Sequence, residues 1–592
     1  MNARRGQFER VRARLARDSD TYRARSRVRV VRTARDIGVA TLVTVTLGAA
    51  TATAATTTGK TTTAKTSATV PSVSVAAKPG ARSRPSVAPT TTRLIAVIPT
   101  TLPAKPTGTI EEAQRLVAEA RAAKNRKALV LTLNELALRL LAAKRAPEAV
   151  TALRESISSL GSLNDPVVLR NTKVMLGWAL NAAGDFAAAT PVLLETLTAA
   201  DQQHADQRIF VNILQLLAWG TRASGDHAHA MQVLGRLRDL GVKGDSSIDL
   251  ADVYEGLALE QIATGAMNDA VASARLAVTR RAAASPVLQA GSYQVLGYAL
   301  DVSGAHAEAM VALQQSIDLR KGAGLGAADP AEAFALLAEA ARKAGDVGTN
   351  LAARTELIAV ARASGDPGRL ADSLDDFALA ALTAGRAPDA LRPLRESVTL
   401  RSAKPDSPAL GGSLQMLGWA LSETKALDEA VDAYRRAVKV RTAVNDTRDA
   451  QLESLRSLGF LLWTLKKPDD SPALFEQVVV LVRRPPTSTP AEAGAFVDLS
   501  VAYLLSQHPD QALTSANRAV SLYDGVATKG EPMAAALYTQ GWALFNSGRQ
   551  RDAIEAFRRS LVIRLATGSD KITETRNFLN AAIEASRSAD AS

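Results

Sequence analysis

The sequence has no cysteine and few aromatic side chains. The absence of cysteine from all 592 residues excludes disulfides, thiol nucleophiles and cysteine-ligated metal sites. Aromatic residues make up 4% of the chain whereas hydrophobic residues make up 47%, so any core must be built mainly from alanine and leucine. Small side chains of this kind suit close packing of helices. The absence of cysteine does not identify the cellular compartment, because exported proteins can also lack disulfides.

Acidic residues are scarce at the N-terminus, where the positive charge is concentrated. The whole chain has a net charge of +12. Residues 1–36 carry 12 arginines against four acidic residues, and residues 37–110 carry seven basic residues and no acid. These segments hold an excess of 15 positive charges, so the remaining 482 residues have a net charge of −3. We therefore consider nucleic acid an unlikely partner of the main body of the chain.

The N-terminal segments have the order of an export signal. A basic run from Arg4 to Arg35 precedes residues 37–59, which carry no charge. A basic segment followed by an apolar one holds the N-terminus in the cytoplasm and directs the following residues across a membrane. We therefore predict a basic cytoplasmic region over residues 1–36. We predict a signal peptide or transmembrane anchor over residues 37–55.

Retention and cleavage of residues 37–55 remain two alternatives. Small residues at positions 50, 52 and 54 fit a signal peptidase site, and threonines weaken this segment as a transmembrane helix. The long basic region and the length of the uncharged span favour an anchor. We expect an exported protein, membrane-anchored with its main body outside the cytoplasm, or secreted if cleavage occurs near residues 52–55.

Residues 56–109 lack both helical periodicity and apolar surface. This Thr/Pro/Ser/Ala-rich tract contains seven prolines, at positions 71, 79, 85, 89, 99, 103 and 106. Such a composition cannot bury enough surface to offset the entropy of ordering. We predict a disordered linker.

From residue 110 onward a unit of about 40 residues recurs. In the stretch Ser413 to Val440, leucines at positions 414, 417 and 421 form one stripe of an amphipathic helix. Ala430 and Tyr434 lie on the corresponding stripe of the next segment. The short polar break at residues 422–425 only allows the chain to reverse direction, so the unit predicts two antiparallel helices.

Small residues keep their register through eleven such units. In the second helix they are Ala149, Ala189, Ala230, Ala270, Ala309, Asn350, Ala390, Ala430, Ser471, Ala512 and Ala553. Twelve residues earlier, in the first helix, lie Ala137, Gly177, Ala218, Ala258, Gly297, Ala338, Ala378, Gly418, Gly459, Ser500 and Gly541. A glycine often opens the turn between the helices, at Gly184, Gly225, Gly265, Gly304, Gly345, Gly385 and Gly548. These turn glycines indicate left-handed helix C-caps.

The pattern resembles the tetratricopeptide repeat (TPR). Its W-x2-L-G-x2-Y and A-x3-F elements correspond to Leu414, Leu417, Gly418, Leu421, Ala430 and Tyr434. The closing proline is missing, and the 40-residue period is similar to that of kinesin light chains and many bacterial regulators. The resemblance implies an all-α fold, an α-solenoid of about eleven helix-turn-helix repeats over residues 110–592. We expect capping helices at Glu112–Arg121 and Lys571–Ser586.

Aromatic residues recur at a position of the first helix where stacking of the helices does not require them. The residue after the small residue of the first helix is aromatic in six units: Trp178, Trp219, Tyr298, Trp419, Phe460 and Trp542. One position on a helix is a rotation of about 100° away from the packing stripe. The resemblance implies that this side faces a concave groove that takes peptides, so these residues are candidate protein-binding residues. Alternatively, the rings fill space between adjacent first helices.

The sequence shows no recognisable pattern of catalytic or metal-binding residues. The five histidines, His204, His227, His229, His306 and His508, lie mainly in turns between paired helices and lack the spacing of metal ligands. No nucleophile–base set or paired carboxylate is recognisable, so we expect no enzyme, cofactor or metal. The sequence favours an envelope scaffold that binds other proteins or peptides. The alternative is a cytoplasmic regulator whose arginine-rich N-terminus contacts nucleic acid. The oligomeric state remains open.

Overall fold

The computed structural model describes residues 108–161, 163–203, 205–324, 330–465, 467–485, 488–525 and 530–590. In this part of the chain all regular elements are helices, which confirms the all-α prediction. The predictions for residues 1–36 and 37–55, and nearly all of the predicted linker, lie outside the described residues. Among the residues that are described, no helix is long and apolar enough to cross a membrane.

The helices form pairs at the predicted spacing. They are α2 (Ile110–Ala122), α3 (Arg126–Ala142), α4 (Ala146–Leu160), α5 (Pro166–Ala182), α6 (Phe186–Gln202), α7 (Gln207–Ala223), α8 (His227–Val242), α9 (Leu250–Ala263), α10 (Met267–Arg280), α11 (Pro286–Val302), α12 (His306–Gly322), α13 (Ala331–Ala344), α14 (Val347–Ala363), α15 (Pro367–Thr383), α16 (Ala387–Ser402), α17 (Pro408–Glu423), α18 (Leu427–Ala443), α19 (Arg448–Thr464), the 3-10 helix η2 (Pro468–Asp470), α20 (Ser471–Val482), α21 (Thr489–Leu505), α22 (Pro509–Asp524), α23 (Glu531–Asn546), α24 (Gln550–Thr567) and α25 (Ile572–Asp590). Odd-numbered helices from α3 to α23 are the first helices of the eleven repeats, and even-numbered helices from α4 to α24 are the second helices.

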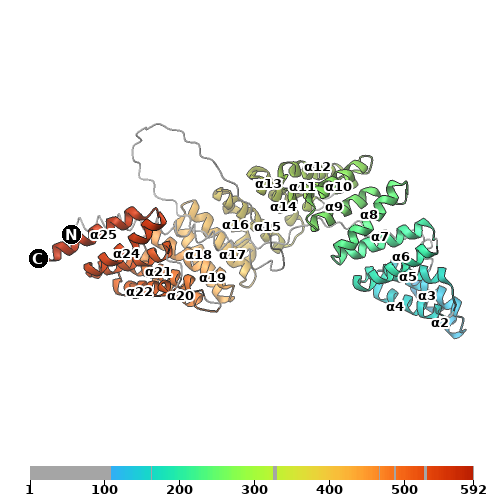
Figure 1. Cartoon of the computed structure of the whole chain (residues 1–592), viewed down its shortest axis with the longest axis horizontal. Coiled ribbons are helices and arrows are strands. Elements are labelled where there is room, and N and C mark those ends of the chain that lie inside the picture. The colour runs from blue at the N-terminus through green and yellow to red at the C-terminus, as the bar shows by residue number, and fades with distance from the viewer. Residues whose placement is uncertain are drawn as a thin grey trace. The chain divides into compact units, whose positions relative to one another are not determined.

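The described chain divides into two compact units at residue 363. One unit holds α2 to α14, and the other holds α15 to α25. Within each unit every helix packs against the next one in sequence, and several first helices also contact the first helix of the following repeat (Figure 1). Each unit is therefore a stack of antiparallel helix pairs, in which a repeat buries its apolar stripe against its neighbours.

The repeat at α17 and α18 shows why these residues form two helices. Ser407 caps α17 by accepting a hydrogen bond from the Leu410 amide, and Pro408 occupies the first helical position, where no backbone donor is needed. The helix ends before Lys425, which has a φ of 67°. A left-handed residue at this point reverses the chain, and α18 begins at Leu427.

The predicted turn glycines adopt the left-handed conformation. Their φ values run from 73° at Gly385 to 91° at Gly304. Where a repeat lacks glycine at this place, Lys144, Lys425 or Gln507 takes the same conformation, with φ between 60° and 67°. The backbone geometry of the turn is therefore the same in these ten repeats, and glycine is the residue that adopts it with least strain.

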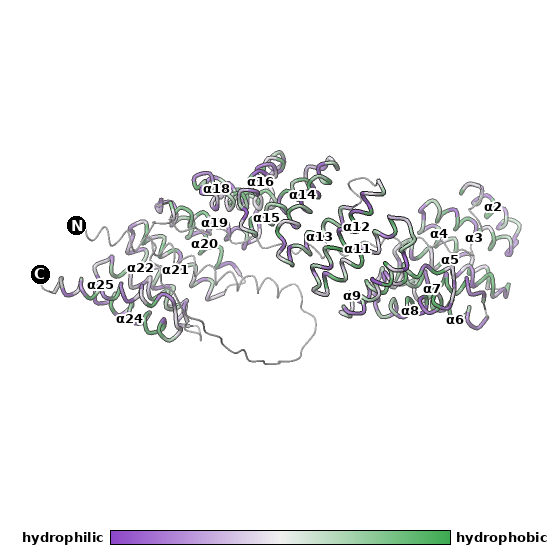
Figure 2. The backbone as a smooth tube through the Cα atoms, turned by 90° about the horizontal axis from the view of Figure 1, so that it is seen from above, coloured by the Kyte–Doolittle hydropathy of each residue, from purple (hydrophilic) through white to green (hydrophobic). Residues whose placement is uncertain are grey.

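Small residues bring the paired helices together, as the register predicts. The second-helix alanines at positions 149, 189, 230, 270, 309, 390, 430, 512 and 553 have no exposed surface. A Cβ built on Gly418 would lie 2.7 Å from the Tyr434 ring, and one on Gly459 would lie 2.6 Å from Phe475. A glycine in the first helix thus makes room for a large side chain four residues after the small one in the second helix. Apolar positions recur along each helix between hydrophilic ones (Figure 2).

The acids at the start of the second helices have specific partners. An acid in the first turn of a helix interacts favourably with the positive end of the helix dipole. In addition, Glu148 pairs with Arg145 at 2.6 Å, and Asp389 pairs with Arg386 at 2.6 Å. The hydrogen bond from Arg145 lowers the pKa of the Glu148 carboxyl. These exposed pairs fix the turn locally, and each contributes little to stability.

Candidate functional site

The six aromatic residues of the predicted row differ in exposure. Tyr298, Trp419, Phe460 and Trp542 are buried, with Trp542 only 1% exposed. Phe460 packs against Trp463 and Phe475, with ring centroids 4.8 and 5.1 Å away. These four rings fill space within and between repeats, the packing role that the sequence leaves as an alternative. Their binding of a partner stays a prediction.

Trp178 and Trp219 retain partly exposed surface. They occupy the same position on the neighbouring first helices α5 and α7. Trp178 packs against the hydrophobic clusters on both sides of it, and Trp219 packs against the second of these clusters. Both side chains are therefore anchored by packing and keep part of their surface exposed.

The aromatic position belongs to a longer stripe on each first helix. Positions six and three residues before the small residue, and one residue after it, lie on the same helical face. We call these positions the first-helix stripe. On α15 the stripe carries Asp372, Asp375 and Leu379, and on α9 it carries Asp252, Glu255 and Leu259. Sequence reasoning identified only the aromatic position and missed the polar ones.

Buried and partly buried arginines at the ends of the second helices face this stripe. They lie eleven residues after the small residue in five repeats: Arg281, Arg320, Arg401, Arg441 and Arg564. Arg281, Arg441 and Arg564 are at most 5% exposed. An alignment of the repeats on their small residues would have revealed this arginine column, because its register is as constant as that of the turn glycines.

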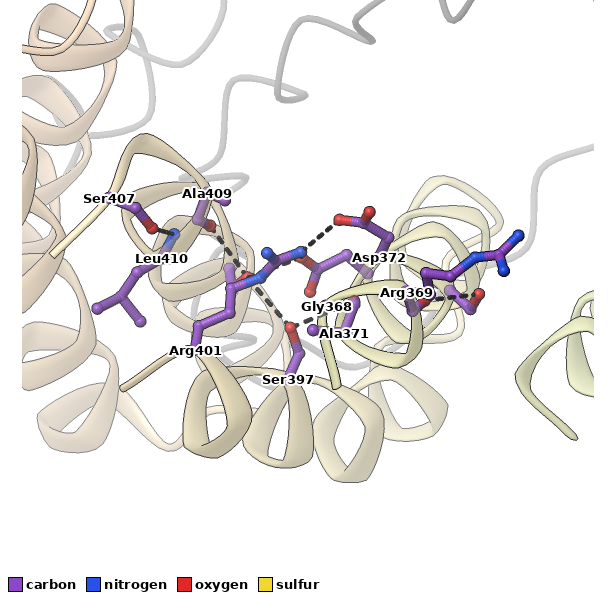
Figure 3. A network of polar contacts seen from close by, with 12 residues as sticks. Gly368, Arg369, Ala371, Asp372, Ser397, Arg401, Ser407, Ala409 and Leu410 are labelled. Carbon is purple, nitrogen blue, oxygen red and sulfur yellow. Dashed lines mark hydrogen bonds and ion pairs between the residues drawn. The ribbon is translucent and has the colours of Figure 1, made fainter. Parts of the chain in front are cut away.

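The cluster at Arg401 joins three helices. Its guanidinium on α16 pairs with Asp372 at 2.8 Å and with Asp375 at 2.9 Å, both on α15. Ser413, on the first helix of the next repeat, donates to Asp375 at 2.7 Å and accepts from Arg401 at 3.0 Å. Figure 3 shows the ion pair between Arg401 and Asp372. Arg401 and Ser413 therefore tie the first helices of adjacent repeats together.

The cluster at Arg281 has the same arrangement in the other unit. Arg281 pairs with Asp249 at 3.0 Å and with Asp252, and its Nε lies 3.8 Å from Glu255. Ser292, on the following first helix, donates to Glu255. Both clusters thus combine a stripe carboxylate, a buried arginine of the same repeat and a serine of the next repeat.

A neutral counterpart occurs at the first repeat junction. Asn134 lies at the stripe position of Glu255 and Asp375, and its amide donates to Thr172 at 2.9 Å. Ser156 donates to the Asn134 oxygen at 2.8 Å. Leu160 replaces the arginine. The junction can therefore be closed by uncharged groups, so the charges of the other two clusters are not required for stacking itself.

Burial sets the pKa values of the stripe carboxylates. Loss of hydration raises the pKa of Glu255 to about 7, against the opposing effect of the Ser292 hydrogen bond. Desolvation also raises the pKa of Asp375, although Ser397, Arg401 and Ser413 favour its charged form. Burial thus shifts the pKa of both carboxylates in the same direction, toward the protonated form.

A glycine directly precedes each of these two serines, at the first position of the first-helix stripe. Gly291 on α11 and Gly412 on α17 lie inside helices, and a Cβ added to either would meet nothing within 4 Å. Glycine in a helix interior costs roughly 0.5–1 kcal/mol relative to alanine. At these two positions the packing of the chain gives no compensating contact, and the helix backbone is left accessible.

Two of the histidines are bonded to acidic side chains. His227 bonds to Glu260 and His306 to Asp301, at 2.7 and 2.8 Å. Within the described residues no group of three or more His, Cys, Asp or Glu side chains could hold a metal ion. A shallow cavity of about 240 Å³ between α22, α23 and α24 includes the ion pair of Arg549 and Asp552. The arrangement as a whole is suited to contact along helices.

Comparison with known proteins identifies the repeat. Residues 410–449, which contain nearly all of α17, the whole of α18 and the turn that follows it, match the family model of the tetratricopeptide repeat. A comparison with curated proteins found no match.

Several solved structures are similar to parts of the chain. BtubC (BKLC) from P. vanneervenii is 18% identical, covers 37% of this chain and 91% of its own, and gives a TM-score of 0.31. A putative kinesin light chain with TPR-like repeats from Podosopora anserina is 19% identical, with 34% and 96% covered and a TM-score of 0.30. The apo form of RapI is 9% identical, with 60% and 98% covered and a TM-score of 0.39. These similarities are too low to indicate a partner.

Proposed function

We propose that this chain, which is a tetratricopeptide repeat protein, is a non-enzymatic scaffold that binds a segment of a partner protein along its first helices. The observation that carries the proposal is the pair Trp178 and Trp219. These residues hold equivalent positions on α5 and α7, and both keep partly exposed surface. Large amphipathic rings held rigidly by packing lose little entropy when they bind, so they are effective anchors for another chain.

Polar groups near these rings favour a polypeptide as the occupant. Gln215 lies four residues before Trp219, on the same helical face, and its buried side-chain oxygen has no hydrogen-bond partner. Asn171 is exposed on the stripe seven residues before Trp178. An apolar ring flanked by amide groups can pair with both the side chains and the backbone of a peptide.

Binding of defined peptides tests this proposal. The full-length protein would be screened on a combinatorial array of synthetic peptides, and the affinities of the bound sequences would then be measured in solution. We expect Trp178→Ala and Trp219→Ala each to weaken binding by roughly tenfold or more, since truncation of a hot-spot anchor costs about 2 kcal/mol or more.

A matched control separates a site from a general surface effect. Val311, on the second helix α12, is 72% exposed, so Val311→Ala removes apolar surface away from the first-helix stripe. This variant should bind like the unmodified protein, and circular dichroism should show equal helicity in all variants. Undiminished binding by both tryptophan variants would remove the stripe as the binding surface.

We further propose that the scaffold is exported and held at the membrane by its N-terminal segment. The proposal rests on the basic run before the uncharged residues 37–59. Protease treatment of intact cells, followed by membrane fractionation and intact-mass analysis, tests it. Digestion of the repeats with residues 1–36 protected is expected for an anchored protein, whereas a mature mass beginning near residue 53 would indicate release. Full protection in a soluble fraction would instead support the cytoplasmic regulator.

A further inference from the structure

The two arginine clusters occur at equivalent junctions three repeats apart, one in each structural unit. Glu255 corresponds to Asp375, Arg281 to Arg401, and Ser292 to Ser413. In both, a largely buried carboxylate on one first helix is bonded to a serine on the next first helix. The side chains of Glu255 and Asp375 are 13% and 14% exposed. The contact between adjacent repeats therefore passes through an ionisable group.

Carboxylates outnumber arginine around Glu255. From its own helix and the N-cap, Asp252 and Asp249 face it, and from the end of α10 Arg281 faces it. α11 contributes the uncharged Ser292. A single guanidinium thus faces three acids, and the ionised form of Glu255 lacks full compensation.

Asp375 has one arginine to share with a second acid. Arg401 on α16 pairs with both Asp375 and Asp372, and the remaining contacts of Asp375 are the hydroxyls of Ser397 on α16 and Ser413 on α17. Its other carboxylate oxygen, Oδ1, is buried without a hydrogen-bond partner. The ionised group is again incompletely satisfied.

We propose that these two junctions are pH-sensitive joints, in which ionisation of the buried carboxylate loosens the packing between the first helices of adjacent repeats. A charged carboxylate held in this site is poorly hydrated, and it gains water when α9 separates from α11, or α15 from α17. In the protonated state the carboxyl stays within the junction, and the arginine remains paired with the outer acids. The inference is independent of any bound partner.

The direction of the pH effect follows from the raised pKa values. The pKa of Glu255 rises from its ordinary 4.5 to about 7 in the folded chain, so the folded state holds a proton that the unfolded state releases. The junction is therefore most stable at or below pH 4.5 with respect to this group, and it loses stability as the pH rises toward 7. The raised pKa of Asp375 gives the same direction.

Hydrogen exchange of the full-length protein tests the joint at Glu255. Protection of α9 and α11, corrected for intrinsic exchange rates, should fall by roughly tenfold between about pH 6 and about pH 8. In Glu255→Gln this dependence should disappear, with greater protection than the unmodified protein at the higher pH. The α3–α5 junction, closed by Asn134, should show no comparable change.

The variant Ser292→Ala tests whether Glu255 is the titrating group, through the pH midpoint of the loss of protection. The Ser292 hydroxyl stabilises the ionised carboxylate, so Ser292→Ala should move the midpoint to higher pH. A purely structural role of this serine would change protection at all pH values without moving the midpoint. Asp375→Asn provides the corresponding test at α15 and α17.

His227, which bonds to Glu260 near the end of α9, is the other group to be distinguished. If the pH dependence persists in Glu255→Gln, a group such as His227 is responsible and the proposal is overturned. An unmodified protein whose α9 and α11 show equal protection across this range would overturn it as well. Should Glu255→Gln fail to fold, the midpoint in Ser292→Ala decides.

Discussion

At the scale of single residues, the local surroundings decide the role of each glycine. Gly412 and Gly418 both lie within α17, six residues apart, and the sequence places both on an apolar helix. A Cβ at Gly418 would lie 2.7 Å from the Tyr434 ring, whereas one at Gly412 would meet nothing within 4 Å. The same substitution should therefore have opposite effects at the two positions.

We predict that Gly412→Ala raises the free energy of unfolding by about 0.5–1 kcal/mol, because alanine is the better helix former. Gly418→Ala should lower it by about 1–3 kcal/mol, since the new methyl group displaces a buried ring. Denaturant unfolding followed by circular dichroism measures both. An increase in stability in both variants would show that the helix contact at Gly418 is looser than the structure indicates.

Sequence patterns predicted the residues whose role is local to a helix pair. The small residues of both helices and the left-handed turn glycines follow from backbone sterics alone, and the structure confirms them. The exposure of the aromatic row could not be predicted, because it depends on the next repeat. Trp178 and Trp542 hold equivalent positions, yet one is half-buried and the other is 1% exposed, with its ring 6.3 Å from Phe578 of α25.

At the scale of helices, the buried arginines connect elements that the sequence treats separately. Arg401 contacts side chains that lie 26 and 29 residues earlier and 12 residues later in the chain. No local pattern contains all of these residues. Only the recurrence of arginine at one register position hinted at a common role.

Arg401→Met should destabilise the unit of α15 to α25 by about 3–5 kcal/mol. The substitution removes the arginine that pairs with Asp375, and an uncompensated buried carboxylate is costly. Lowering the pH should restore part of the loss, because protonation removes the charge. Thermal unfolding at neutral and acidic pH measures both effects.

Arg395 gives a matched control on the same helix. Its ion pair with Glu429 is exposed, with 57% and 62% of the two side chains accessible. Exposed pairs contribute about 0–1 kcal/mol, so Arg395→Met should change stability little. Equal losses in the two variants would mean that the arginine side chains act through their aliphatic packing instead of their charge.

At the scale of the whole chain, stability is distributed along the stacks, because each repeat contacts only its neighbours. The C-terminal helix α25 illustrates this. Its Phe578 is 8% exposed and packs against Tyr538 and Phe557, with ring centroids 5.3 and 5.7 Å away. The end of the stack is thereby covered by an aromatic cluster, as expected for a capping helix that shields the last full repeat.

Phe578→Ala should therefore have a strong but local effect. Truncation of a buried phenylalanine costs about 3–5 kcal/mol, and here the loss falls on the last repeats. Hydrogen exchange should accelerate in α23, α24 and α25. The acceleration should become smaller toward α15, and the exchange rates of α2 to α14 should not change. A uniform acceleration throughout the chain would mean that the repeats unfold as one cooperative body. In that case the repeats would not be independent, and a single pair such as Trp178 and Trp219 would not define a binding surface by itself.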